Sequence, residues 1–143
     1  MPRRPARGLT LLVLVLGVVS GRSAPAQEPA AAPAADATVT PLMATPLAGV
    51  DAREGTMVIV EYPPGGASPP HRHHADVFVY VLGGSVVMQV AGSDPVTLTA
   101  GQTFYESPSD IHAISRNASD TEPAKLLVFM VKEEGAPATV PAE

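Results

Sequence analysis

The sequence predicts an all-β domain, a sandwich or barrel assembled from seven or eight short strands. Stretches rich in β-branched and aromatic residues recur at short intervals, and turn-forming residues separate them. No stretch predicts a helix, because prolines interrupt the Ala-rich segment that comes nearest to one. The predicted strands span residues 56–62, 77–82, 85–90, 96–99, 102–106, 112–116 and 125–132.

Each predicted strand is bounded by a turn signal. Gly83-Gly84, which ends the strand at 77–82, is a hairpin turn signal. The strand boundaries, in chain order, fall at Pro63-Pro64, Gly83-Gly84, Ala91-Gly92-Ser93-Asp94, Ala100-Gly101, Ser107-Pro108 and Asn117.

Two of the predicted strands, 77–82 and 126–131, carry apolar residues on both faces. A half-exposed antiparallel strand alternates between apolar and polar residues, so these strands are expected to be covered on both sides. Two arrangements would cover the outer side. One is a homodimer, and the other is the chain's own segment from Val39 to Val50.

The N-terminus has the pattern of a signal peptide. Three arginines precede an apolar run from Leu9 to Val19, which is too short for a membrane span. Ala24-Pro25-Ala26 then offers a cleavage site before Gln27. We expect an exported protein, periplasmic or secreted, with no membrane span after cleavage. An uncleaved anchor and a twin-arginine signal at Arg3-Arg4 are the alternatives.

The remainder divides by composition into three parts. Residues 27–37 form an Ala/Pro tether without branched or aromatic residues, which is expected to be disordered. Residues 38–134 form the barrel domain, and residues 135–143 are expected to be a flexible tail of similar composition. After cleavage the chain carries five Lys and Arg against fourteen Asp and Glu, a formal charge of −9, so nucleic acid is not expected as a partner. Without cysteine the fold has no disulfides and no thiolate ligands.

Histidines are concentrated just before the strand at 77–82. Because alternate residues of a strand share a face, His71 and His73 can reach one metal ion while Arg72 and His74 point away. His112, at the start of a later strand, is the expected third ligand. The alternative is a solvated His-rich turn without metal. Imidazole suits divalent Fe, Zn, Cu and Ni, and Mn is a further option if the protein folds before export.

These residues resemble the two motifs of the cupin family. In the first motif, five residues separate Gly65 from His71-Arg72-His73, and Gly83 closes the motif. In the second, Gly101 leads to Pro108, His112 and Asn117, with small changes of spacing. The resemblance covers residues 56–132. It implies a double-stranded β-helix, or jelly-roll, barrel with His71, His73 and His112 as metal ligands.

The chain departs from the family at the motif glutamate. That position falls at Val77, or at Phe78 with the longer spacing, and neither side chain binds metal. Asp76 would need a β-bulge to turn inward as a fourth ligand. Glu106, at the end of a strand near the second motif, is a comparable candidate. Either carboxylate is also a candidate catalytic base.

The sequence leaves three functions open. One is a metal-dependent dioxygenase or isomerase acting on a small organic molecule, as the resemblance implies. Another is a non-catalytic module that binds a small ligand or a metal, and the third is a scaffold with a degenerate site. A pocket beside the metal, with a carboxylate in reach of bound water, would favour the enzyme. A site closed by Val77 and its neighbours would favour the binding module.

Overall fold

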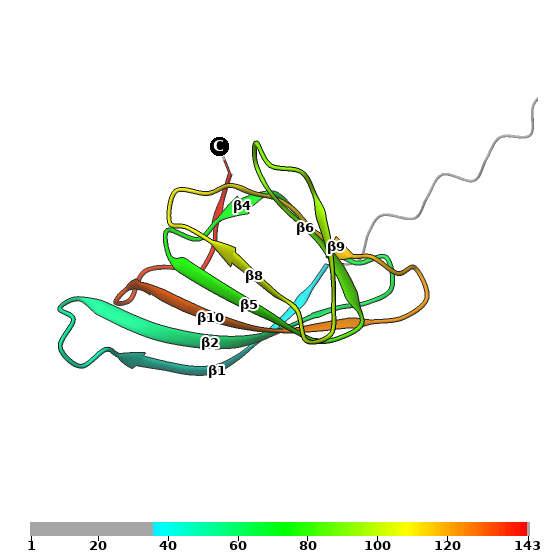
Figure 1. Ribbon diagram of the computed structural model, residues 1–143. Helices are drawn as coiled ribbons and strands as arrows, with labels where there is room; N and C mark the ends of the chain where they lie inside the picture. Colours follow the sequence, from blue (N-terminus) through cyan, green and yellow to red (C-terminus); the bar gives the residue numbers. More distant parts are fainter. Residues whose placement is uncertain (1–35, 143) are drawn as a thin grey trace, which may run out of the picture. The chain divides into compact units, whose positions relative to one another are not determined.

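The computed structural model describes residues 36–142, which form two antiparallel sheets (Figure 1). One sheet has the order β1-β2-β10-β5-β8, and the other has β11-β4-β9-β6-β7 with β3 paired to β9. The proposed signal peptide and most of the tether lie outside the described residues. Within residues 36–142, no helix has the length and apolarity needed to cross a membrane. The strands are β1 Thr38–Pro46, β2 Arg53–Tyr62, β3 Ala67–Ser68, β4 His71–Arg72, β5 Asp76–Gly83, β6 Ser85–Val90, β7 Val96–Thr99, β8 Thr103–Glu106, β9 His112–Asn117, β10 Ala124–Glu133 and β11 Val140–Pro141.

The predicted all-β fold is confirmed, and each of the predicted strands corresponds to one of β2 and β5–β10. The hairpin expected at Gly83-Gly84 is wrong as a strand pairing, because β5 pairs with β10 and β8 whereas β6 pairs with β9 and β7 of the other sheet. Gly83-Gly84 is instead the turn through which the chain passes from one sheet to the other, and its geometry has a steric basis. Gly84 has φ 71°, and an added Cβ would lie 2.3 Å from the carbonyl oxygen of Pro123. Four strands were not predicted: β1, β3, β4 and β11. Three of these have two residues each, and β1 contains two prolines, which are tolerated because it is an edge strand.

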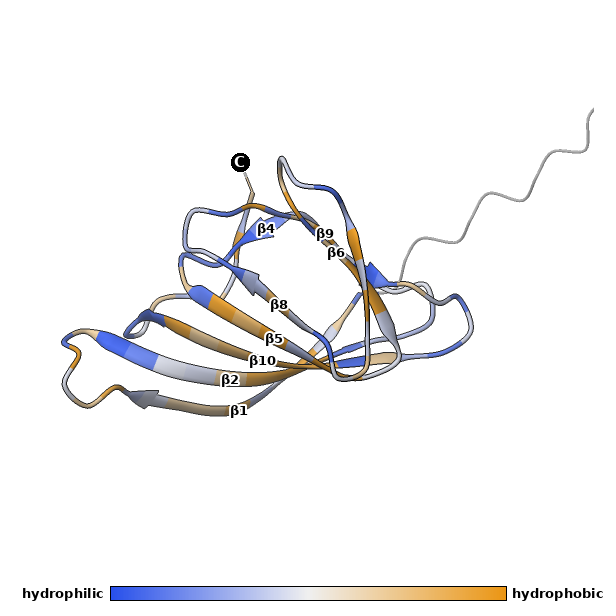
Figure 2. Ribbon diagram, in the orientation of Figure 1, coloured by the Kyte–Doolittle hydropathy of each residue, from blue (hydrophilic) through white to orange (hydrophobic). Residues whose placement is uncertain are grey.

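The core lies between the two sheets. From β5, Val77, Val79 and Val81 point inward, and Met88 of β6 meets them from the opposite sheet. Figure 2 shows apolar residues along β5 and β10, which are neighbouring interior strands of their sheet. Side chains along β5 alternate between the two faces of the sheet. The odd-numbered residues point into the core, and the even-numbered residues face outward.

The outer face of β5 and β8 is apolar and exposed. Phe78, Tyr80 and Tyr105 are 48%, 45% and 50% exposed, and they line a shallow groove with Phe129 of β10. The alternative that residues 39–50 cover this face is wrong, because β1 pairs with the far edge of β2 and is exposed throughout. The homodimer hypothesis stays a prediction.

The C-terminal segment differs from the expected tail. Lys132 is buried and donates hydrogen bonds to the Glu54 carboxylate and the Ala136 carbonyl oxygen. Further on, Val140–Pro141 pairs with β4 as strand β11. The folded part therefore continues to residue 142, beyond the predicted boundary at residue 134.

Candidate metal centre

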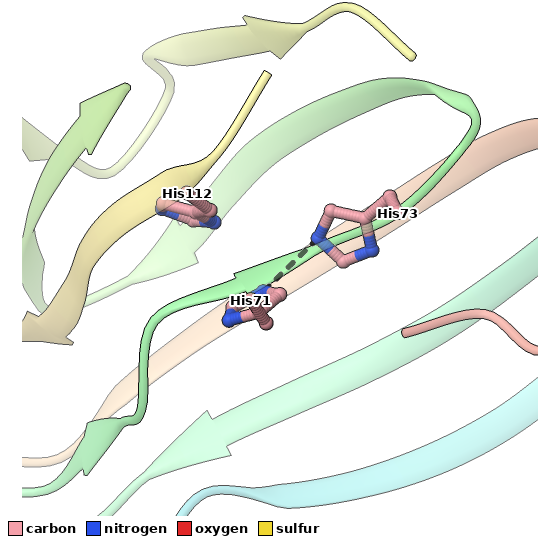
Figure 3. A group of neighbouring side chains, drawn as sticks. All are labelled: His71, His73 and His112. Atoms are coloured by element: carbon pink, nitrogen blue, oxygen red, sulfur yellow. Dashed lines mark hydrogen bonds between the residues drawn. The ribbon is translucent and has the colours of Figure 1, made fainter. Parts of the chain in front are cut away.

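Three histidines converge at one end of the core (Figure 3). His71 begins β4, His112 begins β9, and the two are direct partners in the antiparallel ladder. His73 follows β4 and lies on the same side as His71, as strand parity predicts. One ring nitrogen from each histidine lies within 4.8 Å of the other two. The three predicted ligands are thus brought together.

Backbone carbonyls fix the tautomers of two rings. His71 Nδ1 lies 2.8 Å from the Pro69 carbonyl oxygen, and His73 Nδ1 lies 2.8 Å from that of Ala138. A carbonyl oxygen only accepts, so each Nδ1 carries the proton in the neutral ring and each Nε2 presents a lone pair. Metal-binding histidines are oriented by this kind of contact.

The two Nε2 atoms face each other at 3.1 Å. Two lone pairs at that distance repel unless a positive charge lies between them. Burial lowers the pKa of His71 below its ordinary value of 6.5, with smaller contributions from His73 and His112, which disfavours a shared proton. Two nitrogens bound at about 2.1 Å to one ion, at right angles, would be about 3.0 Å apart. The spacing therefore suits a metal ion.

His112 is 3% exposed, and neither of its ring nitrogens has a hydrogen-bond partner among the described residues. Its Nδ1 lies 3.1 Å from Glu106 Oε1, but this close contact is not aligned as a hydrogen bond. A buried polar atom without a partner costs about 1–3 kcal/mol. A bound metal ion would give one of these nitrogens its partner.

Glu106 is 2% exposed and lies beside the histidines. Its other oxygen, Oε2, lies 3.8 Å from His73 Nε2. Within the described part of the chain, this carboxylate forms no ion pair with a lysine or arginine. A buried carboxylate is costly to keep ionised without a positive partner, so the cluster as a whole favours a cation.

The second carboxylate candidate, Asp76, lies elsewhere. Its Oδ1 accepts a hydrogen bond of 2.6 Å from the Tyr105 hydroxyl, and this bond raises the pKa of Tyr105. The β5–β10 ladder pairs Asp76 with Val131 and Val77 with Met130 without a bulge, so Asp76 points away from the cluster as parity predicts. His74 is exposed and has φ 47°, which places it in the turn before β5.

A cavity of about 460 Å³ adjoins the cluster. The histidines and Glu106 line it together with apolar side chains from both sheets. A second polar group lines the same cavity, because Tyr62 Oη lies 2.9 Å from Ser68 Oγ and 2.6 Å from Ser115 Oγ. Sequence reasoning missed these hydroxyls and the carbonyls of Pro69 and Ala138, since nothing in residue type marks them. The apolar lining includes Val58, Val79, Met88, Leu126, Val128 and Met130.

A model of the cupin domain family matches residues 58–130. The chain belongs to the cupin family. The glycine that begins each motif lies in a tight turn: Gly65 has φ 67° and Gly101 has φ 89°, a conformation that favours glycine. Asn117, the last residue of the second motif, binds the backbone around the first of these turns. The cupin motifs therefore place both histidine-bearing strands at one end of the core.

Solved structures agree with the cupin fold. A double-stranded β-helix protein from Klebsiella pneumoniae is 20% identical, with TM-score 0.59 over 76% of this chain and 85% of that one. An oxalate oxidase bound to the substrate analogue glycolate is 25% identical, with TM-score 0.59 over 73% and 54%. The DMSP lyase DddQ from Ruegeria pomeroyi is 23% identical, with TM-score 0.54 over 62% and 43%. This chain thus spans about half or less of the two enzymes. A search of curated proteins finds no match.

Proposed function

We propose that this cupin is a metal-dependent enzyme that acts on a small organic molecule. His71, His73 and His112 would hold a divalent transition metal. The observation that carries the proposal is the pair of Nε2 atoms at 3.1 Å, both bearing lone pairs, beside a buried carboxylate and a cavity. The metal would supply Lewis acidity toward a substrate oxygen. Oxygenation, if the metal is iron, and isomerisation are the proposed reaction classes.

The cavity supports a substrate with an apolar body and an oxygen donor. Its walls are mostly aliphatic, and no lysine or arginine of residues 36–142 lines it. A charged group far from the metal would therefore have no counter-ion. The Tyr62 and Ser115 hydroxyls offer hydrogen bonds to an uncharged polar group. The oxalate oxidase, solved with glycolate, is a cupin enzyme with a small oxygen-bearing ligand, which is consistent with this proposal.

A non-catalytic binding module is the alternative. It would be favoured if Val77 and its neighbours closed the site. Val77 is fully buried in the wall, yet the cavity reaches the histidines and Glu106. This arrangement supports the enzyme over the binding module and over an empty scaffold.

Metal content tests the proposed site. The chain purified from its native compartment is expected to carry about one equivalent of one transition metal by mass spectrometry, and His73→Ala should lose it. His74→Asn is the matched control, because His74 is exposed and asparagine tolerates its positive φ. Asp76→Asn should also keep the metal. A sub-stoichiometric mixture that His73→Ala leaves unchanged would contradict the proposal.

We also propose export, which the N-terminal sequence supports, and a homodimer through the groove of Phe78 and Tyr105. Phe78 is 48% exposed, so Phe78→Glu should leave the fold intact while it dissociates the dimer. Sedimentation velocity would measure both species. A wild-type chain that sediments as a monomer at high micromolar concentration would exclude the dimer.

A further inference from the structure

We propose that Glu106 supplies, from the neighbouring strand, the metal-binding carboxylate that the first motif lacks at Val77. The site would then hold its ion with three imidazoles and one carboxylate. This inference rests on the proposed metal site and specifies its ligand set.

The ladder between β5 and β8 carries the first step of the argument. Val77 and Glu106 are direct partners in this antiparallel pair. Directly opposed residues project to the same face of a sheet, with Cβ atoms about 5 Å apart. Val77 is 0% exposed and faces the core, so Glu106 enters the core beside it. A side chain that starts one strand away can therefore reach the place where the motif glutamate would lie.

The contacts of the carboxylate carry the second step. Glu106 Oε1 lies 3.1 Å from His112 Nδ1, and Oε2 lies 3.8 Å from His73 Nε2. The contact with His112 is not aligned as a hydrogen bond. Two ligands that converge on one ion direct their lone pairs at the ion rather than at each other. Glu106 contacts ring nitrogens of two of the three histidines, His112 Nδ1 and His73 Nε2, as is expected of ligands that converge on one ion.

The charge of the site carries the third step. Within residues 36–142 no lysine or arginine pairs with Glu106, although the carboxylate is 2% exposed. Buried ionised carboxylates are normally paired or bind metal. A divalent ion held by the three neutral histidines would supply the missing positive charge. The carboxylate would also make the site more favourable for Mn²⁺ than imidazoles alone.

The test moves the carboxylate across the strand pair. Mn²⁺ affinity would be measured by titration calorimetry for the full chain, Glu106→Val, Glu106→Gln and the double variant Val77→Glu/Glu106→Val. Glu106→Val is expected to weaken binding at least about tenfold. The double variant should recover most of that loss, because the glutamate returns to the same place from β5. Thermal melts of each metal-free variant would confirm that it is folded.

Glu106→Gln separates a ligand from an orienting group. Glutamine keeps an oxygen that can accept a hydrogen bond from His112, but it lacks the charge that a cation requires. The glutamine variant should therefore lose Mn²⁺ affinity and change the visible absorption of bound Co²⁺, which reports on the ligand set. Unchanged affinity and spectrum in Glu106→Gln, or a folded double variant that does not recover, would overturn the inference and leave the three-histidine site standing. If neither the wild-type chain nor any variant binds metal, this inference and the proposed function both fail.

Discussion

Ending the chain at Pro137 is expected to weaken metal binding by about 10- to 100-fold while the barrel stays folded. The truncation removes the Ala138 carbonyl oxygen, which lies 2.8 Å from His73 Nδ1. Without this acceptor, His73 is free to rotate or to place its proton on Nε2, the atom that faces His71. Strand β11, which holds the segment against β4, is lost as well. The free energy of ordering the His73 side chain would then be subtracted from the free energy of metal binding.

The barrel should survive because the truncation spares its main ladders. Lys132 keeps both of its partners, Glu54 and the Ala136 carbonyl oxygen. Zn²⁺ affinity by competition with a chromophoric chelator would measure the loss. ¹⁵N chemical shifts of the metal-free histidines would show the change of tautomer at His73 directly. The control is a chain that ends at Pro141, which retains Ala138. Equal affinity and an unchanged His73 tautomer in the chain that ends at Pro137 would show that the segment does not position the histidine.

The three histidines of the cluster were predictable because they depend on local rules. Alternation along a strand put His71 and His73 on one side, and the spacing of the second motif identified His112. The same parity rule pointed Asp76 away from the site unless a β-bulge turned it inward, and in the structure Asp76 binds Tyr105 instead. These inferences need no knowledge of which strands are neighbours, so a single sequence is enough to make them.

The rest of the site depends on tertiary pairing. Glu106 was a candidate because it ends a strand near the second motif, but its position opposite Val77 follows from the β5–β8 register. The role of Ala138 was invisible, because any residue has a carbonyl oxygen and the segment around it is poor in bulky apolar side chains. Pairing of backbone atoms, and not burial of side chains, places this segment. Composition therefore predicted a tail where the structure has a wall of the cavity.

Replacing Asn117 with alanine is expected to lower the free energy of unfolding by about 3 kcal/mol. Asn117 is 2% exposed. Its Nδ2 donates to the carbonyl oxygens of Pro63 at 3.0 Å and Glu122 at 2.8 Å, with a longer contact to Tyr62, and its Oδ1 accepts from Ser119 N at 2.9 Å. Alanine would remove all of these bonds and leave partly buried backbone groups without their partner. Each lost bond contributes about 1 kcal/mol, and buried groups without partners add to the cost.

A loss of this size would lower the melting temperature by roughly 10–20 °C in a domain of about 100 residues. Urea denaturation in the presence of a chelator would measure it without a contribution from metal binding. Asn117→Asp is the matched variant. It keeps the shape and the acceptor for Ser119 but replaces the donor with a charge that faces the carbonyl oxygens of Pro63 and Glu122, so it should be at least as unstable. If the aspartate variant were as stable as the wild type, the donors would be dispensable. The turn before His71 would then be held by the remaining backbone bonds, those from Gly65 N to Ser119 and from Asn117 N to Gly66.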